Sequence, residues 1–249
     1  MDSNISPETM MLVRASREIA DNQIVFVGIG LPNLACNLAK KLHAPNIELV
    51  YEAGVIGAAP ERIPISIGDP ALVAGSLGIC SQADIFQYYL QGGKVDLGFL
   101  GGAQIDPFGN INSTVIGSYD HPKVRLPGSG GACAIATHSK KTLVIMKLSL
   151  KSFVKSCDFI TSPGVLNAQG EKRDNFLANG MGPVKIITDH CVFSWNKKQY
   201  QVTEIYPSSS KQQIIDLVEW DIVFSDELKN CSLPSKEEEN ELKNLYKKA

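Results

Sequence analysis

The sequence predicts an open α/β fold: a mainly parallel sheet with helices on both faces, followed by an irregular or antiparallel C-terminal extension. Helix and strand patterns alternate through the first half of the chain. The strand-like segments are short and apolar almost throughout, which is typical of parallel strands that are buried on both faces. Glycines gather just after these segments, where a parallel sheet forms its ligand crevice.

The N-terminal half supplies the elements of the parallel sheet. Ser6 and Pro7 predict a helix that runs to about Ala20, since serine is a favoured N-cap and proline is accepted at the first helical position. Pro32 breaks the chain before a second expected helix at residues 34–42. The buried strands are predicted at residues 24–27, 47–51, 95–100 and 142–146.

The last third has strand-like segments joined by polar turns, which suggests an antiparallel extension. These segments are residues 184–188, 192–195 and 200–205. Ser209 and Gln212 have the spacing of a capping box ahead of a helix. Ser235 and Glu238 repeat that spacing, so we expect residues 235–249 to form a peripheral, solvated helix. No linker or repeat divides the chain, and residues 1–249 are expected to form a single domain.

Composition excludes several classes of function. A formal net charge of −2 gives no basic surplus for nucleic-acid binding. No apolar run approaches the roughly 18 residues of a membrane span, and the N-terminus lacks a signal-peptide pattern, so we expect a cytoplasmic protein. The six cysteines are scattered without a Cys-x-x-Cys pair, which argues against a metal site and a disulfide scaffold.

The glycine clusters mark the expected ligand site. Gly28 and Gly30, Gly54 and Gly57, Gly101 and Gly102, and Gly128, Gly130 and Gly131 follow strand-like runs in turn. Any one cluster can be explained as a tight turn. Four clusters after strands favour a shared crevice, because glycine lets the backbone approach a ligand. A dinucleotide fingerprint does not fit, since Asn33 stands where its third glycine would fall.

Four segments in this order resemble the β subunit of family I CoA-transferases, and most closely the glutaconate CoA-transferase β subunit. They are Val27-Gly28-Ile29-Gly30-Leu31-Pro32, Tyr51-Glu52-Ala53-Gly54, the run GGAQIDPFGNINS from Gly101 to Ser113, and the run from Tyr119 to Gly131. The resemblance is strong over residues 18–164 and looser beyond. Relatives often have Asn or Ser where this chain has Ala53, so a hydrogen bond from that side chain is absent here.

The resemblance implies a ping-pong CoA transfer between an acyl-CoA and a carboxylic acid, such as a dicarboxylate like glutaconate. It implies that Glu52 is the nucleophile, that an α subunit is the partner, and that acyl-CoA is a substrate with no tightly bound cofactor. We expect Glu52 at the floor of a cleft, half-desolvated, because full burial would neutralise it. The residues expected to bind CoA or the oxyanion are Gly28, Gly30, Gly101, Gly102, Gln104, Gly130 and Gly131.

Several alternatives stay open at this point. Relatives on the same scaffold act as acyl-CoA decarboxylases or hydrolases, and a non-catalytic effector-binding domain is a third interpretation. Gln104 and Asp106 are as well explained by capping a turn as by binding substrate. His121 and His138 lack an evident nucleophile to activate, and Cys133 lacks a basic neighbour. Lys123 and Arg125 are candidates for binding a distal carboxylate, as is the partner chain.

Overall fold

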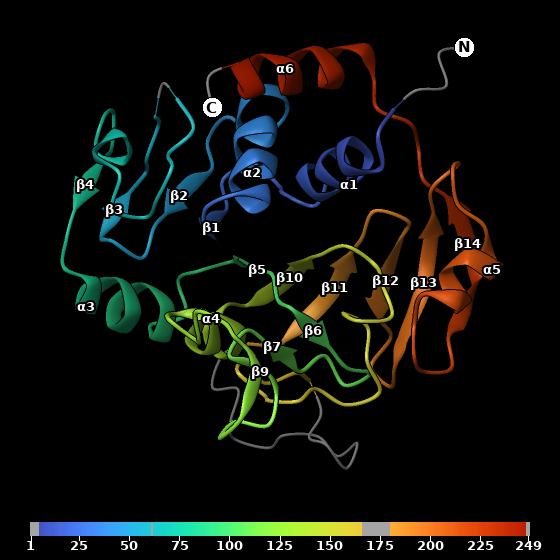
Figure 1. The fold of residues 1–249 in the computed structure, drawn as a ribbon. Helices are drawn as coiled ribbons and strands as arrows, with labels where there is room; N and C mark the ends of the chain where they lie inside the picture. Colours follow the sequence, from blue (N-terminus) through green and yellow to red (C-terminus); the bar gives the residue numbers. More distant parts are fainter. Residues whose placement is uncertain (1–4, 61, 166–179, 248–249) are drawn as a thin grey trace.

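The computed structural model describes residues 5–60, 62–165 and 180–247, and most of its strands join one large sheet (Figure 1). In the described part of the chain this sheet has 10 strands, in the order β14-β13-β12-β11-β10-β5-β1-β2-β3-β4. Its strands are β1 Ile24–Phe26, β2 Glu48–Val50, β3 Val55–Ile56, β4 Gly78–Ile79, β5 Leu97–Leu100, β10 Lys141–Ile145, β11 Pro183–Ile187, β12 Cys191–Trp195, β13 Tyr200–Ile205 and β14 Val223–Asn230.

The sheet is parallel in its centre and has antiparallel pairs on both sides of it, while the edge strand β14 is again parallel to its neighbour β13. Strands β11, β10, β5, β1 and β2 run parallel to one another. Strand β12 is antiparallel to both β11 and β13, which confirms the predicted extension. Strands β3 and β4 add antiparallel pairs at the other end, which the sequence did not predict. The predicted fold class, an open and mainly parallel α/β sheet, is confirmed.

Helices and short ribbons cover the two faces of the sheet. They are α1 Pro7–Ser16, α2 Leu31–Leu42, η1 Pro70–Leu72, α3 Gln82–Asp84, η2 Ile85–Gln91, α4 Ala132–His138, α5 Lys211–Asp216 and α6 Lys236–Lys247. Two small hairpins pair β6 Gln104–Ile105 with β7 Ile111–Asn112, and β8 Val115–Gly117 with β9 Pro122–Arg125. Helices α1, α2 and α6 lie on one side of the sheet, and α3 and α4 on the other (Figure 1).

The apolar core divides along the alternation of side chains in the strands. Val25 and Leu49 belong to the cluster that includes residues of α1, α2 and α6. Phe26 and Val50, one residue further along the same strands, belong to the cluster on the other face, with η2 and α4. Successive side chains of a strand point to opposite faces, so strands covered on both sides must be apolar throughout. That rule is why the central strands could be predicted from sequence.

Three local predictions were wrong at their boundaries. Helix α2 begins at Leu31, not at residue 34, because Pro32 occupies its first turn and does not interrupt the helix. Helix α1 ends at Ser16, four residues short of Ala20. The capping box of α5 uses Ser210 with Gln213, one residue beyond the predicted pair at Ser209 and Gln212.

The C-terminal helix is more deeply anchored than expected. The capping box between Ser235 and Glu238 is confirmed by its two reciprocal hydrogen bonds. The prediction of a solvated helix was wrong, because Leu242 and Leu245 are buried in the core cluster. Glu238 also accepts a two-pronged hydrogen bond from Arg17, just beyond α1. The helix therefore closes one face of the sheet, while residues 248–249 lie outside the described range.

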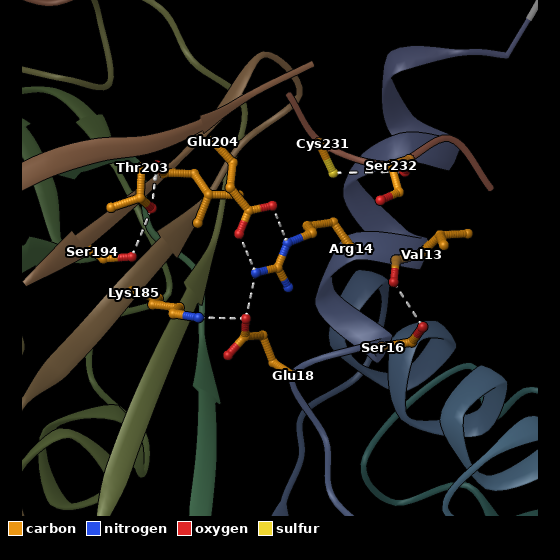
Figure 2. Close-up of polar contacts among 11 residues, drawn as sticks. Val13, Arg14, Ser16, Glu18, Lys185, Ser194, Thr203, Glu204, Cys231 and Ser232 are labelled. Atoms are coloured by element: carbon orange, nitrogen blue, oxygen red, sulfur yellow. Dashed lines mark hydrogen bonds and ion pairs between the residues drawn. The ribbon is translucent and has the colours of Figure 1, made fainter. Parts of the chain in front are cut away.

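A chain of charged groups joins α1 and the residues just after it to strands β11 and β13 (Figure 2). Arg14 Nε and Nη2 donate to the two carboxylate oxygens of Glu204 on β13, at 2.7 and 2.6 Å. Arg14 also pairs with Glu18, which in turn accepts from Lys185 Nζ on β11 at 2.5 Å. Burial disfavours the charge on Glu204, but the Arg14 guanidinium outweighs it and lowers the pKa of that carboxyl. The Arg14–Glu204 pair therefore stays ionised at neutral pH.

Substituting Glu204→Gln removes an acceptor that balances a largely buried guanidinium. We expect it to lower the free energy of unfolding at pH 7 by about 2–3 kcal/mol, measured by urea denaturation. Because the folded-state pKa is depressed, the stabilisation is present above the unfolded pKa of about 4.3 and is lost as pH falls through the lower folded value. As the pH is lowered below about 4, the free energy of unfolding should therefore fall less in the variant than in the wild type.

Glu239→Gln is the matched control for this experiment. Glu239 pairs with Lys243 at 4.0 Å on the surface of α6, so its removal should change the free energy of unfolding by less than about 0.5 kcal/mol. Equal losses from the two substitutions would contradict the role given to the buried network.

Candidate active site

The candidate site lies at β1, where the chain stops adding strands on one side of this strand and continues the sheet on its other side. From β1 the chain passes through α2 to β2 on one side, whereas β5 pairs with β1 on the other side. In open parallel sheets, ligands bind at the carboxyl ends of the strands at such a switch point. A cleft of about 340 Å³ is found there. Its lining is Gly28, Ile29, Leu31, Pro32, Glu52, Phe99, Leu100, Gly101, Ser129, Gly130, Gly131, Ala132, Ile135 and Ile145.

Glu52 is carried by a tight loop between β2 and β3. Gly54 N donates to Tyr51 O, and Tyr51 N donates to Val55 O, both at 3.0 Å. This is the pattern of a turn followed by a glycine in the left-handed region, and Gly54 has φ +100°. A Cβ on Gly54 would lie 2.0 Å from the carbonyl oxygen of Cys80, so only glycine fits here. The loop fixes where the Glu52 side chain leaves the backbone.

Tyr51 anchors the start of this loop to α2. Its side chain is fully buried, and its hydroxyl accepts a hydrogen bond from Asn33 Nδ2 at 2.5 Å. Burial raises the pKa of the Tyr51 phenol well above its usual value, so it stays neutral. Asn37 in turn donates to Asn33 Oδ1 at 2.8 Å. The residue before Glu52 therefore cannot shift without breaking a buried polar chain.

Glu52 as a whole residue is half-buried, and its carboxylate faces glycine backbone while its contact with Gln82 is exposed. A Cβ on Gly131 would lie 3.2 Å from Oε2, and one on Gly130 would lie 3.7 Å from Oε1. The same Cβ on Gly131 would lie 2.6 Å from Cζ of Phe86. Gln82 Nε2 donates to Oε1 at 3.3 Å. The carboxylate thus has one oxygen bound by an amide, and a backbone wall against which substrate can lie.

The glycines after β1 and β5 reach the same cleft. Gly28 and Gly101 line it together with Glu52. Gly30 has φ +83° and directly precedes α2, whose first residues, Leu31 and Pro32, also line the cleft. The first turn of a helix carries unsatisfied N–H groups, which favour an anionic ligand. The cleft lining therefore gathers four of the seven glycine and glutamine candidates with Glu52: Gly28, Gly101, Gly130 and Gly131. Gly30 precedes the residues of α2 that line the cleft but does not line it itself.

Two predicted binding residues, Gly102 and Gln104, do not line the cleft. Gln104 is 6% exposed, and its side chain is already engaged. Its Oε1 accepts from Asn112 Nδ2 at 2.7 Å and from Asp158 N at 3.0 Å, while its Nε2 donates to Asp158 Oδ2 at 3.2 Å. At Gly102 a Cβ would lie 2.4 Å from Ile111 Cγ2, so glycine serves packing there. The motif gave their order along the chain but not the direction of their side chains.

The alternative interpretation of this segment, a capped turn, fits the structure. One oxygen of Asp106 accepts from the backbone N–H groups of Phe108 and Asn110, and the other accepts from Asn110 Nδ2 at 2.7 Å. Asn112 Oδ1 accepts from Thr114 N at 3.0 Å. These short polar side chains satisfy the backbone of the hairpin under the cleft. They shape the site without lining it.

None of the other candidates lines the cleft with Glu52. His121 and Lys123 are exposed on or beside β9. Arg125 donates to Tyr119 O at 3.0 Å, and its guanidinium lies 4.8 Å from the centre of the Tyr119 ring. His138 ends α4, and Cys133 N donates to Ser129 Oγ within the first turn of that helix. Among the described residues that line this cleft, none is a cation that could bind a distal carboxylate.

Sequence reasoning missed two residues of the site. Gln82 and Phe86 approach Glu52 and Gly131 from the start of α3 and from η2. One local signal was available, since Ser81 and Asp84 form a capping box that marks a helix start at Gln82. No sequence signal near Gln82 indicates that this helix start lies beside Glu52.

The described residues show neither a metal-binding cluster nor a membrane-spanning helix. No group of three or more His, Cys, Asp or Glu side chains is arranged to hold a metal ion within residues 5–60, 62–165 and 180–247. Within the same ranges, none of the helices has the length and apolar character to cross a bilayer.

Comparison with known proteins defines the class of this chain. The family model described as "Coenzyme A transferase" matches residues 8–217. Together with the cleft, this match shows that the chain belongs to the coenzyme A transferase family, and the prediction of a CoA-transferase is confirmed.

The similar proteins narrow the comparison further. The chain is 43% identical to the β subunit of 3-oxoadipate CoA-transferase from Pseudomonas knackmussii, over 98% of this chain and 94% of the relative. It is 33% identical to the β subunit of glutaconate CoA-transferase from Acidaminococcus fermentans, over 90% of this chain and 86% of the relative. The predicted similarity to the glutaconate CoA-transferase subunit is therefore confirmed. The prediction that the chain resembles this subunit most closely was wrong, because the sequence identity to the 3-oxoadipate CoA-transferase subunit is higher.

Solved structures support the fold. The crystal structure of glutaconate coenzyme A-transferase from Acidaminococcus fermentans superposes with a TM-score of 0.87 at 30% identity, covering 96% of this chain and 93% of that one. The decarboxylase AibA/AibB superposes with a TM-score of 0.83 at 23% identity, covering 96% and 94%. At that identity the second likeness concerns the fold alone.

Substituting Gly131→Ala should place a methyl group against Phe86 and the Glu52 carboxylate. We expect CoA-transferase activity of the assembled enzyme to fall about 100-fold, because displacement of a reacting group by about 1 Å is costly. Steady-state kinetics would measure this, with circular dichroism to verify folding. Gly68→Ala is the control, because a Cβ there meets nothing within 4 Å. Full activity in Gly131→Ala would contradict the placement of this wall.

Proposed function

We propose that this chain is the β subunit of a CoA-transferase that moves CoA between an acyl-CoA and a dicarboxylic acid, with Glu52 as the nucleophile. The observation that carries the proposal is the position of Glu52, half-buried in a cleft walled by Gly130, Gly131 and Gly101. A carboxylate suits the reaction because the bond it forms with an acyl group remains activated toward a second carboxylate or thiolate.

The reaction proceeds through bonds to Glu52. An oxygen of Glu52 attacks the thioester carbonyl, and the resulting tetrahedral oxyanion expels CoA thiolate and leaves a mixed anhydride. The thiolate then attacks Cδ of Glu52, breaking its bond to the acyl oxygen, so that the first acid departs and a glutamyl-CoA thioester remains. The acceptor acid repeats the steps in reverse. Backbone N–H groups at Gly101 are the proposed donors to the oxyanion of the substrate thioester.

The identity of the acid is proposed from the similar proteins. Both 3-oxoadipate and glutaconate are dicarboxylates, and the relative named for 3-oxoadipate shares 43% of residues against 33% for the other. We therefore propose a dicarboxylate acceptor, with 3-oxoadipate favoured over glutaconate. Since no described residue of the cleft lining is a cation, the group that binds the distal carboxylate comes from outside this lining, and a partner chain is the proposed source.

An exposed apolar surface beside the site is the proposed contact with that partner. Leu77 and Ile79 are 75% and 63% exposed. Leu77 packs over Gly57, and Ile79 pairs with Val55 just after the Glu52 loop. Large apolar side chains gathered in one place mark interaction surfaces. A partner α subunit on this surface would also exclude water from the anhydride, which hydrolysis would otherwise destroy.

The nucleophile can be tested by trapping the covalent intermediate. The chain is co-expressed with the α subunit encoded next to it and incubated with succinyl-CoA, and the peptide containing Glu52 is examined by mass spectrometry for a CoA adduct. Glu52→Gln should lose the adduct and at least about 1,000-fold of the transfer rate, since covalent catalysis is removed. An unmodified peptide together with an active Glu52→Gln variant would refute the assignment.

The same preparation separates transfer from decarboxylation and hydrolysis. Acyl-CoA should be stable without an acceptor acid and should react when 3-oxoadipate or glutaconate is added. Release of CO₂ or free CoA at full rate without an acceptor would favour a decarboxylase or a hydrolase.

Substituting Ile79→Asp should weaken assembly without unfolding the chain, because this side chain is 63% exposed. Charge placed in a buried apolar contact costs roughly 2–4 kcal/mol, so we expect the affinity between the two chains to fall about 30-fold or more. Analytical ultracentrifugation of the purified subunits would measure it. Ile215→Asp on α5 is the control, because that residue is 44% exposed on another part of the surface. Unchanged affinity in Ile79→Asp would place the contact elsewhere.

A further inference from the structure

The side-chain amide of Gln82 makes a contact with Glu52 that the nucleophile role alone does not explain. Gln82 Nε2 donates to Glu52 Oε1 at 3.3 Å. The other oxygen, Oε2, faces the Gly131 backbone, 3.2 Å from where a Cβ would stand. The two carboxylate oxygens therefore have different surroundings: Oε1 accepts from an amide and is the oxygen nearer to Gly130, whereas Oε2 is the oxygen nearer to Gly131.

The position of Gln82 is set by the structure around it and not by its own side chain. Ser81 and Asp84 form a reciprocal capping box, which fixes the start of α3 at Gln82. Cys80 N donates to Gly54 O at 2.9 Å, which joins this segment to the Glu52 loop. Behind it, Phe86 packs against Phe26 with ring centres 5.8 Å apart. The amide donor and the carboxylate are thus attached to one framework through Gly54, although 30 residues separate them.

The chemistry of Glu52 gives the amide a specific task. After the first attack, Cδ of Glu52 is itself an electrophile in two later steps: CoA thiolate attacks it in the anhydride, and the acceptor carboxylate attacks it in the glutamyl-CoA thioester. Each attack opens the Cδ=O double bond and places negative charge on the glutamyl carbonyl oxygen. If Oε2 has formed the bond to the acyl group, Oε1 is that carbonyl oxygen. An amide N–H directed at it stabilises the developing charge, and being uncharged it does not hold the starting carboxylate too tightly.

We propose that Gln82 is a catalytic residue that donates to the oxyanion formed on the carbonyl of Glu52 itself, and that by occupying Oε1 it selects Oε2 as the attacking oxygen. This inference rests on the proposed function of Glu52 as nucleophile. The oxyanion concerned differs from the one on the substrate thioester, which is assigned to the backbone at Gly101. One site therefore contains two oxyanion positions, and Gln82 serves the one that returns each time the intermediate breaks down.

The test isolates a step in which Cδ is attacked. The assembled enzyme is loaded with succinyl-CoA, freed of released succinate by rapid desalting, and shown by mass spectrometry to hold CoA on the Glu52 peptide. It is then mixed with acceptor acid, and loss of the adduct is followed by chemical quench. For Gln82→Ala we expect this decay to slow about 100-fold, as removal of one oxyanion donor does elsewhere. Gln87→Ala is the control, because Gln87 is also an exposed glutamine and lies in the following helix η2. Its CoA adduct should decay at the wild-type rate.

A second variant distinguishes hydrogen-bond donation from a merely structural effect. In Gln82→Glu the introduced carboxylate cannot donate and repels the oxyanion, so decay should again be slow at pH 7. Below about pH 4.3 the introduced carboxyl becomes protonated and can donate, so the rate relative to wild type at the same pH should recover. Gln82→Ala should show no such recovery.

The outcomes separate this inference from the proposed function. Wild-type decay rates in Gln82→Ala, with the adduct present on Glu52, would overturn the role of Gln82 and leave the nucleophile intact. Slow decay in Gln82→Glu that does not recover on acidification would also overturn it, because shape and not donation would then matter. An absence of any adduct in the wild-type enzyme would reject the proposed function itself.

Discussion

The active site depends on a backbone contact that only glycine permits. Gly54 lies so close to the carbonyl of Cys80 that a methyl group would overlap it, and the two segments are joined there by a hydrogen bond from Cys80 N to Gly54 O. This contact turns the chain sharply after β2, so that Glu52 leaves the sheet at the cleft. It also brings the start of α3, with Gln82, beside the carboxylate. The positions of Glu52, of Gln82 and of the loop between them thus depend on one close approach.

Apolar side chains, polar side chains and glycine backbone have different roles around this contact. The apolar layers on both faces hold β1, β2 and β5 in register, so their carboxyl ends meet at a fixed place. Polar side chains such as Asp106 and Gln104 satisfy the hairpins beneath and are not free for substrate. What remains open to a ligand is backbone: the glycines after β1, β5 and β9. A site of this kind offers a ligand shape and backbone N–H groups, and its described lining offers no cationic side chain.

The sequence predicted those parts of the molecule whose signals are local. Continuous apolar segments located the central strands, and serine followed by glutamate located the start of α6. Strands β3 and β4 were missed because two-residue strands carry no periodicity. The start of α2 was misplaced because Pro32 has opposite meanings inside a helix and in its first turn. Gln82 was missed and Gln104 misassigned for one reason: sequence motifs record order, whereas side-chain direction and contacts across 30 residues arise only on folding.

The ion pairs of the first helix bear on how the chain is made. Arg14 is 190 residues from its partner Glu204, and Arg17 is 221 residues from Glu238. A ribosome synthesises roughly 5–20 residues each second, so α1 waits on the order of ten seconds or more for the residues that neutralise it. Throughout that time Arg14 has only the neighbouring Glu18 as a native ion-pair partner, and α6 cannot cover the helix. The native packing of α1 is therefore completed only when the last part of the chain has been synthesised.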